Sequence, residues 1–280
     1  MNELRQQNFS LVRLLKVAGL ARSTFYWHLG NAERKEKYSR EKAFILETYH
    51  HHRGRYGYRR ITIACRKMGW MLNHKTVRRL MLEQNLKSRI RVKKYRSYRG
   101  QYGRSAPNLL ERKFSADRPN QKWVTDVTEF RIKEKKLYLS PIVDLYNGEV
   151  IAWSMAESPG GGMVNEMLMK AVATLKDGET PLVHTDQGWQ YHMHGWKQVL
   201  KERSMPQSMS GKGNCLDNAR MENFFGTLKA ECWHGEKYKD VAELMEAVDE
   251  YIHYYNTERI SLKLKGLSPV EYRTQALMTA

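Results

Sequence analysis

The sequence predicts an α/β domain, built on a mixed five-stranded sheet with flanking helices, that follows an all-α helix-turn-helix region. Its 280 residues are enough for about two domains. Charge divides the chain in the same way, because residues 1–120 hold 29 Lys and Arg against 8 Asp and Glu, whereas residues 121–280 hold 19 against 22. Helical spacing of apolar residues also gives way to strand-like runs after about Asn120. We therefore expect a helix-turn-helix region over residues 1–86, a basic linker over 87–119, an α/β core over 120–235 and a helical extension over 236–280.

Two helix-turn-helix units are predicted in the N-terminal region. Residues 11–30 indicate a helix, a turn at Gly19 and a short helix that Ser23 and Thr24 would cap. Residues 58–86 indicate a second unit, in which apolar side chains recur at helical spacing on both sides of a break at residues 69–73. The side chains expected to pack in this second unit are Tyr58, Ile61, Ala64, Cys65, Met68, Val77, Leu80, Met81 and Leu86.

The net charge of +18 favours a polyanionic partner, and nucleic acid fits better than an anionic membrane. The second helix of the second unit places Lys75, Arg78 and Arg79 on its exposed face, where a helix that enters a DNA groove carries its basic residues. The same charges are also typical of an ordinary solvated helix, so both interpretations stay open here.

The predicted linker contains a strongly basic stretch from Lys87 to Arg104 that has no acidic residue. Three tyrosines are interleaved with its cations, which is typical of a segment that orders on a phosphate backbone and stacks on bases. A solvated tether between two domains is the alternative. The basic residues of the stretch are Lys87, Arg89, Arg91, Lys93, Lys94, Arg96, Arg99 and Arg104.

The α/β region begins with strand-like runs at residues 122–132, 135–146 and 149–158. The Asn147-Gly148 pair between the last two runs predicts a two-residue hairpin. Three meandering strands followed by alternating helices and strands indicate a mixed sheet covered by helices. The later elements are expected as a helix at 163–175, a strand at 181–186, a helix at 194–203 and a strand at 205–210.

The cysteines and the apolar runs narrow the class of protein. Cys65, Cys215 and Cys232 form no CxxC pair, which argues against a disulfide framework or a thiolate zinc site. No apolar run is long enough to span a bilayer, and the first ten residues lack the pattern of a secretory signal. We expect a cytoplasmic, nucleoid-associated protein.

Three acidic residues occupy positions where catalytic groups collect in a mixed sheet, at strand ends around a crevice. Asp126 lies in the first strand run and Asp186 ends the fourth. Glu222 lies in the first turns of a helix that follows a turn-rich segment at residues 211–218. Any one of these acids is also typical of a surface or capping carboxylate, so the prediction depends on their joint placement.

A buried acid among apolar residues costs free energy unless its charge is compensated, and one divalent cation compensates three carboxylates together. Hard oxygen ligands favour Mg²⁺ or Mn²⁺ over zinc or copper. Two such ions about 4 Å apart support phosphodiester chemistry. We therefore expect Asp126 to bridge two ions, and Asp186 and Glu222 each to hold one of them.

Four segments, WVTDVTEF, HTDQGWQY, SMSGKGNCLDNARMENFFGTLK and YNTERISLKLKGLSPVEYR, carry a family resemblance. Together they resemble the second-reading-frame (OrfB) part of insertion-sequence transposases of the IS-three group, close to its 150-like branch and related to retroviral integrases. The resemblance covers nearly the whole chain, because YGYRRIT and HKTVRRLM are similar to the helix-turn-helix region of that family. It implies a ribonuclease H-like integrase catalytic core and a DDE triad, catalytic and metal-binding, at Asp126, Asp186 and Glu222.

The resemblance implies a Mg²⁺-dependent polynucleotidyl transferase that cuts one strand at an insertion-sequence end and uses the 3′-hydroxyl to attack another phosphodiester. The implied partners are terminal inverted repeats, target DNA, further copies of the chain, and an upstream-frame (OrfA) fusion or partner. Thr185 and Trp189 depart from the commoner residues of the family, although both keep the motif in register. A non-catalytic DNA-binding regulator and a simple nuclease remain as alternatives.

Five further residues are candidates for roles near the site. His184 either neighbours the active site or packs within its strand, and Asn218 is a second candidate neighbour. Lys229 shares the Glu222 face of its helix and could reach a phosphate, and Arg259 belongs to a C-terminal basic patch that suggests DNA contact or a solvated surface. Asp144 precedes the Asn147-Gly148 turn and is explained by turn capping.

Overall fold

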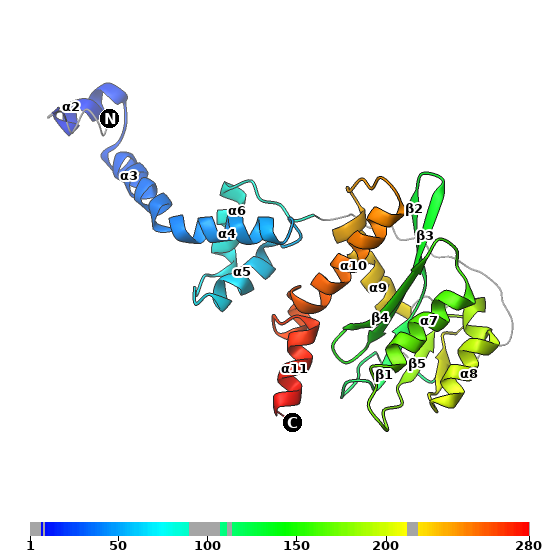
Figure 1. Ribbon diagram of the computed structural model, residues 1–280. Coiled ribbons are helices and arrows are strands. Elements are labelled where there is room, and N and C mark those ends of the chain that lie inside the picture. Colours follow the sequence, from blue (N-terminus) through cyan, green and yellow to red (C-terminus); the bar gives the residue numbers. More distant parts are fainter. Residues whose placement is uncertain (1–6, 8, 90–106, 111–113, 212–217, 280) are drawn as a thin grey trace. The chain divides into compact units, whose positions relative to one another are not determined.

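The computed structural model describes residues 7, 9–89, 107–110, 114–211 and 218–279 (Figure 1). The chain divides into two compact units, an N-terminal unit of Met1–Ser88 and a C-terminal unit of Arg89–Ala280. The basic stretch with Lys93, Lys94, Arg96 and Arg99 lies almost wholly outside the described residues. Within the described part of the chain, no helix is both long and apolar enough to cross a membrane.

The N-terminal unit is entirely helical in its described part. Gly19, in the left-handed region at φ 62°, ends the first helix as predicted. The next helix begins at Arg22, so Ser23 and Thr24 lie inside its first turn, and the prediction that they cap it is wrong. The helices are α2 (Leu11–Ala18), α3 (Arg22–Lys37), α4 (Ser39–His51), α5 (Tyr58–Lys67) and α6 (His74–Glu83).

The helices α5 and α6 confirm the second predicted helix-turn-helix unit, and α4 packs against both. Ile61 of α5 and Val77 of α6 are fully buried, as is Ile45 of α4, which the sequence patterns did not reveal. Asn73 caps α6 by accepting a hydrogen bond from the Lys75 backbone N–H at 2.9 Å. Met68, expected in this core, is exposed.

The C-terminal unit is built on one mixed sheet, in agreement with the predicted fold class. Its centre is β1, which pairs antiparallel with β3 and parallel with β5. Outside these strands, β4 pairs antiparallel with β3, and β6 pairs parallel with β5. The strands are β1 (Lys122–Thr125), β2 (Thr128–Ile132), β3 (Lys135–Asp144), β4 (Val150–Ala156), β5 (Leu182–Thr185) and β6 (Gln207–Met209).

The first predicted strand is divided into β1 and β2, which raises the number of strands in the sheet to six. Thr125 pairs with Ile142, and β2 resumes the same register along β3 three residues later. This register places Asp126 opposite Pro141, which has no N–H to donate to a neighbouring strand. The interruption therefore leaves Asp126 outside the regular ladder, in the middle of an otherwise continuous strand.

The predicted hairpin between β3 and β4 is present, but its loop is longer than two residues. The Asp144 N–H donates to the Glu149 carbonyl at 2.9 Å, and the Gly148 N–H donates to the Asp144 carbonyl at 2.8 Å. Gly148 has φ 75°, a conformation that glycine adopts at little cost. Residues 145–148 therefore form the loop, with Gly148 as its left-handed position.

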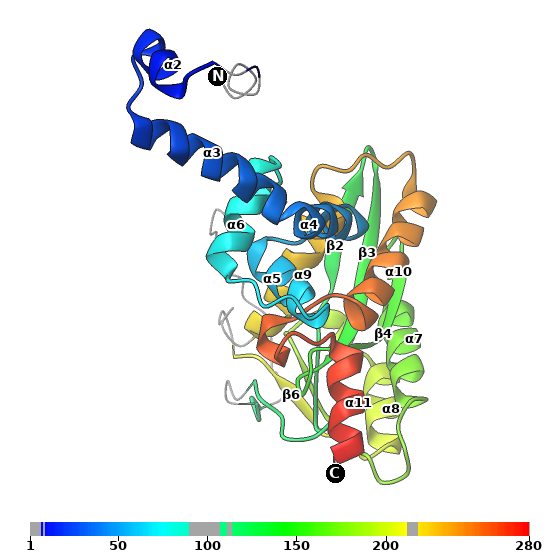
Figure 2. The ribbon, with the colours of Figure 1, turned by 90° about the vertical axis from the view of Figure 1, so that its left-hand side faces the viewer.

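Helices cover both faces of the sheet. On one face, α7 (Gly161–Val172) and α8 (His194–Glu202) enclose a core with Trp123 and Val183. On the other face, α9 (Ala219–Leu228) and α10 (Val241–Thr257) enclose a core with Val124 and Leu139. Figure 2 shows α10 alongside β3 and β4, followed by α11 (Pro269–Thr279). Because neighbouring strand residues point to opposite faces, Trp123 and Val124 anchor the two cores.

Parts of the predicted linker and of the predicted C-terminal extension also belong to this packing. Leu110 is buried in the core that contains α9 and α10, and Leu244 and Ile252 of α10 are buried there with it. The extension is therefore integral to the C-terminal unit, because its helix supplies one of the two layers that cover the sheet.

Candidate active site

Two of the three predicted acids follow neighbouring parallel strands. Val124 of β1 is opposite His184 of β5. Two residues later, each strand is followed by an acid, Asp126 after β1 and Asp186 after β5. Parallel strands end at the same edge of a sheet, so both carboxylates lie at one edge. The register itself therefore brings together two residues that are 60 positions apart in the sequence.

The Asp126 carboxylate is partly buried and held from two directions. Its Oδ1 accepts a hydrogen bond from the Val127 backbone N–H at 2.7 Å. Its Oδ2 accepts one from Asn218 Nδ2 at 2.9 Å, and Asn218 is itself buried just before α9 begins. Each carboxylate oxygen has a second lone pair, so both can still bind a cation.

The Asp186 carboxylate is positioned by the turn that follows β5. Its Oδ1 accepts a hydrogen bond from the Gly188 backbone N–H at 2.9 Å, and its carbonyl accepts one from Thr185 Oγ1 at 2.9 Å. Thr185, a departure from the commoner residue of the family, thus stabilises this turn. The turn leads into the short 3-10 helix η1 (Trp189–His192), whose Tyr191 is fully buried.

Glu222 lies in the first turn of α9, as predicted. Met221 and Phe225, one residue before it and three residues after it in α9, are buried in the core that contains Val124 of β1. This packing fixes α9 against the sheet and leaves the Glu222 side chain exposed. Glu222 is therefore available to solvent and ligands on a rigid element.

The three acids share one electrostatic environment. Burial, together with the negative charges of Asp186 and Glu222, raises the pKa of Asp126 from 3.8 to about 8, against the opposing effect of the Val127 N–H. Burial also raises the pKa of Asp186, although the Gly188 N–H and the charge of His192 act in the opposite direction. Both other acids therefore lie near enough to Asp126 for their charges to act on its carboxylate.

Stability should depend on pH because of the raised pKa of Asp126. Between about pH 4 and pH 8, the folded protein retains a proton that the unfolded chain releases. Without divalent ions, the free energy of unfolding should therefore fall as pH rises through this window. The Asp126→Asn variant should melt several degrees above the wild type at pH 8 and close to it near pH 4, as thermal unfolding can measure. The exposed Asp177→Asn variant is the control, and identical pH profiles for Asp126→Asn and the wild type would contradict the assignment.

The residues present fit a divalent cation. Among the described residues, none of the three acids forms an ion pair with a lysine or arginine, so their charge is not compensated there. The buried Oδ1 of Asn218 also has no hydrogen-bond partner in that part of the chain. Carboxylate and amide oxygens are the ligand type that Mg²⁺ and Mn²⁺ prefer.

The candidate neighbours have different roles. Asn218 contacts Asp126 directly, whereas His184 is fully buried and its Nδ1 forms a hydrogen bond with Ser208 Oγ of β6 at 2.9 Å. His184 therefore has the packing role that was one of its two interpretations. Tyr191 was missed: burial and the charges of Asp126 and Asp186 raise the pKa of its hydroxyl, which places it near both acids. Its place in the HTDQGWQY motif was the available signal.

Two residues expected to bind DNA are engaged within the fold. Arg259 is buried and forms a bidentate ion pair with Glu231, through Nε at 2.8 Å and Nη2 at 2.6 Å. Its guanidinium is committed to Glu231, so we do not retain Arg259 as a DNA ligand. Lys229 Nζ donates to the Glu129 carbonyl at 2.9 Å and lies 5.1 Å from the centre of the Phe130 ring. The ammonium of Lys229 is thus held against β2.

The remaining predicted residues lie as follows. Lys75, Arg78 and Arg79 are exposed on α6, where Arg79 pairs with Glu83 at 2.5 Å. Asp144 is fully buried, forms an ion pair with Arg273 and accepts a hydrogen bond from the Tyr146 N–H at 3.0 Å. Asp144 therefore stabilises the turn between β3 and β4.

Comparisons with known proteins agree with this architecture. Residues 116–215 and 222–277 each match a family described as an integrase core domain, and residues 35–94 match an HTH-like domain. The chain is 54% identical over 278 residues to the putative transposase InsK for insertion sequence element IS150 of Escherichia coli (strain K12), covering 99% of this chain and 98% of that protein. The chain belongs to the insertion-sequence transposases of this family. Its activity is DNA transposition, by an enzyme with an integrase core.

Other relatives of the transposase are more distant. It is 34% identical over 286 residues to the transposase InsF for insertion sequence IS3A of Escherichia coli (strain K12), covering 98% of both chains. A solved structure of the HTLV-2 integrase catalytic core domain in complex with magnesium is 19% identical, covering 56% of this chain and 98% of that one, with a TM-score of 0.41. The predicted family and fold class are thus confirmed by the sequence relatives and by the matching domain families.

Proposed function

We propose that Asp126, Asp186 and Glu222 are the catalytic triad of the transposase and together hold divalent metal, Mg²⁺ or Mn²⁺, as two ions. The observation that supports this most strongly is the parallel register of β1 and β5, which brings Asp126 and Asp186 to one edge of the sheet, where α9 with Glu222 packs on β1. Burial and the charges of the other two acids also raise the pKa of Asp126 to about 8. Such a cluster costs free energy in the metal-free protein, and catalytic sites often accept this cost. Bound metal would supply Lewis-acid activation of phosphodiester oxygens.

The reaction proceeds in two displacements at phosphorus. Water attacks the phosphodiester at the end of the insertion sequence, and the bond to the 3′-oxygen breaks to leave a 3′-hydroxyl. That hydroxyl then attacks a phosphodiester of target DNA, forms the new bond and displaces the 3′-oxygen of the target strand. The residues of the chain orient the acids: the Val127 N–H and Asn218 hold the carboxylate of Asp126, and the Gly188 N–H holds that of Asp186.

A joining assay tests this function. The full chain is incubated with Mg²⁺, target DNA and a duplex that ends in the terminal inverted repeat of its element, either intact or already cut to expose the 3′-hydroxyl. We expect cleaved ends from the intact duplex and joined products from the pre-cut duplex. Hydrolysed ends without any joined product would identify a nuclease and contradict the proposal.

The proposed DNA ligands outside the active site are Lys75, Arg78 and Arg79 of α6, together with Lys93, Lys94, Arg96 and Arg99 of the basic stretch. We propose that they bind terminal inverted repeats and target DNA, and that the transposase acts as a homo-oligomer with an upstream-frame (OrfA) fusion or partner. Support comes from the exposure of the three α6 side chains on a helix-turn-helix unit. Two ends must be held together for joining, which favours an oligomer.

Neutralising the basic residues from Lys87 to Arg104 should reduce the salt dependence of DNA binding. If the stretch contacts about five phosphates, the slope of log affinity against log salt should become shallower by about 4 to 5. Fluorescence anisotropy over a range of salt concentrations measures this slope. An unchanged slope would show that the stretch is only a tether.

A further inference from the structure

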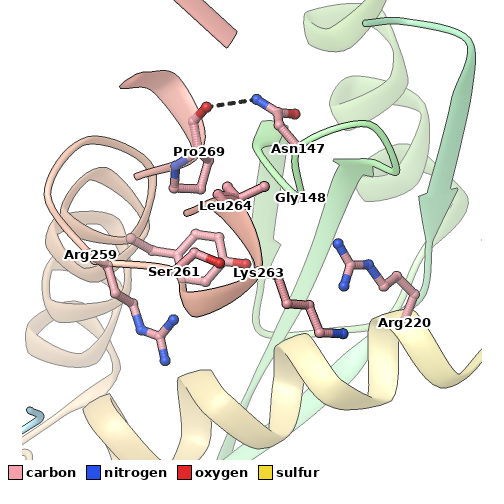
Figure 3. Close-up of a pocket in the computed structure, with 9 residues that line it drawn as sticks. Asn147, Gly148, Arg220, Arg259, Ser261, Lys263, Leu264 and Pro269 are labelled. Carbon is pink, nitrogen blue, oxygen red and sulfur yellow. Dashed lines mark hydrogen bonds between the residues drawn. The ribbon is translucent and has the colours of Figure 1, made fainter. Parts of the chain in front are cut away.

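A pocket rich in positive charge lies in the C-terminal unit (Figure 3). The β3–β4 loop contributes Gly148, α9 contributes Arg220, and the segment from the end of α10 contributes Tyr255, Ser261 and Lys263. Three cations and no carboxylate line this pocket. Three segments far apart in the sequence thus converge on a site that is chemically the opposite of the acidic cluster.

The positive charge of this pocket is only partly neutralised within the fold. Arg259, which also lines it, is paired with Glu231. Arg220 and Lys263 form no ion pair in the part of the chain that the structure describes. Arg220 is also half-buried, and an arginine partly removed from water without an acidic partner favours an anionic ligand.

The β3–β4 loop is shaped to accommodate Arg220. A Cβ atom at Gly148 would lie 3.2 Å from Arg220 Nη2 and 3.7 Å from the Tyr255 hydroxyl oxygen, so both donors border the same point. Glycine at this position lets the guanidinium approach the loop backbone closely. Guanidinium, ammonium and hydroxyl donors directed into one pocket suit the several oxygens of a phosphate group.

Arg220 and Glu222 lie on opposite flanks of α9. Two residues correspond to a rotation of about 200° around a helix, and the core-facing side chains lie between them. Met221, Phe224 and Leu228 form that buried face. A group bound at Arg220 would therefore hold α9 from the side opposite the acid.

We propose that this pocket binds a phosphate of the DNA backbone, with Arg220 and Lys263 as its ligands. The inference rests on the proposed function, because it assumes that DNA is the polyanion engaged by the catalytic unit. The contact fixes α9, and with it Glu222, relative to the bound DNA.

DNA binding by the full chain, measured by fluorescence anisotropy at several salt concentrations, tests this proposal. EDTA is present throughout, so binding is separated from cleavage. Arg220→Gln and Lys263→Gln should each weaken DNA binding about tenfold. Each should also make the slope of log affinity against log salt shallower by about 0.9, and the double variant should make this slope shallower by about 1.8. Lys201→Gln, on the exposed surface of α8 outside the pocket, is the matched control and should leave the slope unchanged.

The outcomes separate this proposal from the catalytic one. Lys263 is exposed, so Lys263→Gln tests the pocket even if Arg220→Gln fails to fold. Unchanged slopes in the pocket variants, or an equal reduction in Lys201→Gln, would overturn the proposal while leaving the joining assay unaffected. A further outcome is that inorganic phosphate stabilises the wild type against unfolding and fails to stabilise Lys263→Gln, while the salt slope of DNA binding is the same in both proteins. That result would assign the pocket to a small phosphorylated ligand and would also overturn the proposal. Shallower slopes in a protein that joins no DNA would support the pocket and contradict only the catalytic function.

Discussion

Replacing any one acid of the triad by its amide, in Asp126→Asn, Asp186→Asn or Glu222→Gln, should reduce strand cleavage and joining by about a thousandfold or more. The amides keep the size of the side chains but remove the charges that would hold a divalent ion. Loss of that ion would remove several kcal/mol of transition-state stabilisation, and each 1.36 kcal/mol corresponds to about tenfold in rate. DNA binding should persist, because no acid of the triad contributes positive charge.

The controls for this experiment carry the same chemical changes away from the site. Asp177→Asn and Glu246→Gln replace exposed acids on the loop after α7 and on α10, and both should cleave and join at wild-type rates. Gel analysis of the DNA products and anisotropy of the bound duplex measure activity and binding separately. Amide variants of the triad that retain activity would leave the non-catalytic regulator as the better account.

Breaking the buried ion pair between Arg259 and Glu231 should strongly destabilise the C-terminal unit. The two side chains are 10% and 8% exposed, and the Tyr251 hydroxyl also donates to Glu231 at 3.0 Å. Arg259→Met leaves the carboxylate of Glu231 buried without its counter-ion, so the free energy of unfolding should fall by about 3–5 kcal/mol. Urea unfolding of the two single variants and of the double variant with Glu231→Leu measures this effect.

Two comparisons control for causes other than the buried charge. The double variant should be much more stable than Arg259→Met, because it removes both charges together. Lys170→Met breaks an exposed pair with Glu166 and should cost at most about 1 kcal/mol. If Arg259→Met were no more destabilising than Lys170→Met, Arg259 would be free to act as the DNA ligand that its basic neighbourhood first suggested.

The strands and helices that could be predicted are those whose residue patterns lie within one short segment of the sequence. Alternating apolar runs predicted the strands, and acids at the ends of two of them predicted where Asp126 and Asp186 would meet, because parallel strands share an edge. Glu222 was predictable because a turn-rich segment leads directly into its helix.

Features that depend on partners distant in the chain were not predictable. The ladder between Thr125 and Thr128 is interrupted opposite Pro141, a pairing that only the register along β3 reveals. A single strand was therefore predicted where two are present. Arg259 was interpreted as a surface cation because no sequence pattern links it to Glu231, its ion-pair partner 28 residues earlier. The apolar residues of helix α4 are not gathered on one face of the helix, so the sequence did not mark a buried side. Its buried Ile45 is explained only by the packing of α4 on α5 and α6.

Diffraction from crystals soaked in Mn²⁺, recorded at wavelengths where manganese scatters anomalously, would locate the metal directly. We expect an anomalous peak about 2.0–2.2 Å from carboxylate oxygens of Asp126 and of Asp186 or Glu222, and its loss in Asp126→Asn. A saturated crystal with no manganese between these acids, or with carboxylates too far apart to share an ion, would contradict the proposed catalytic site.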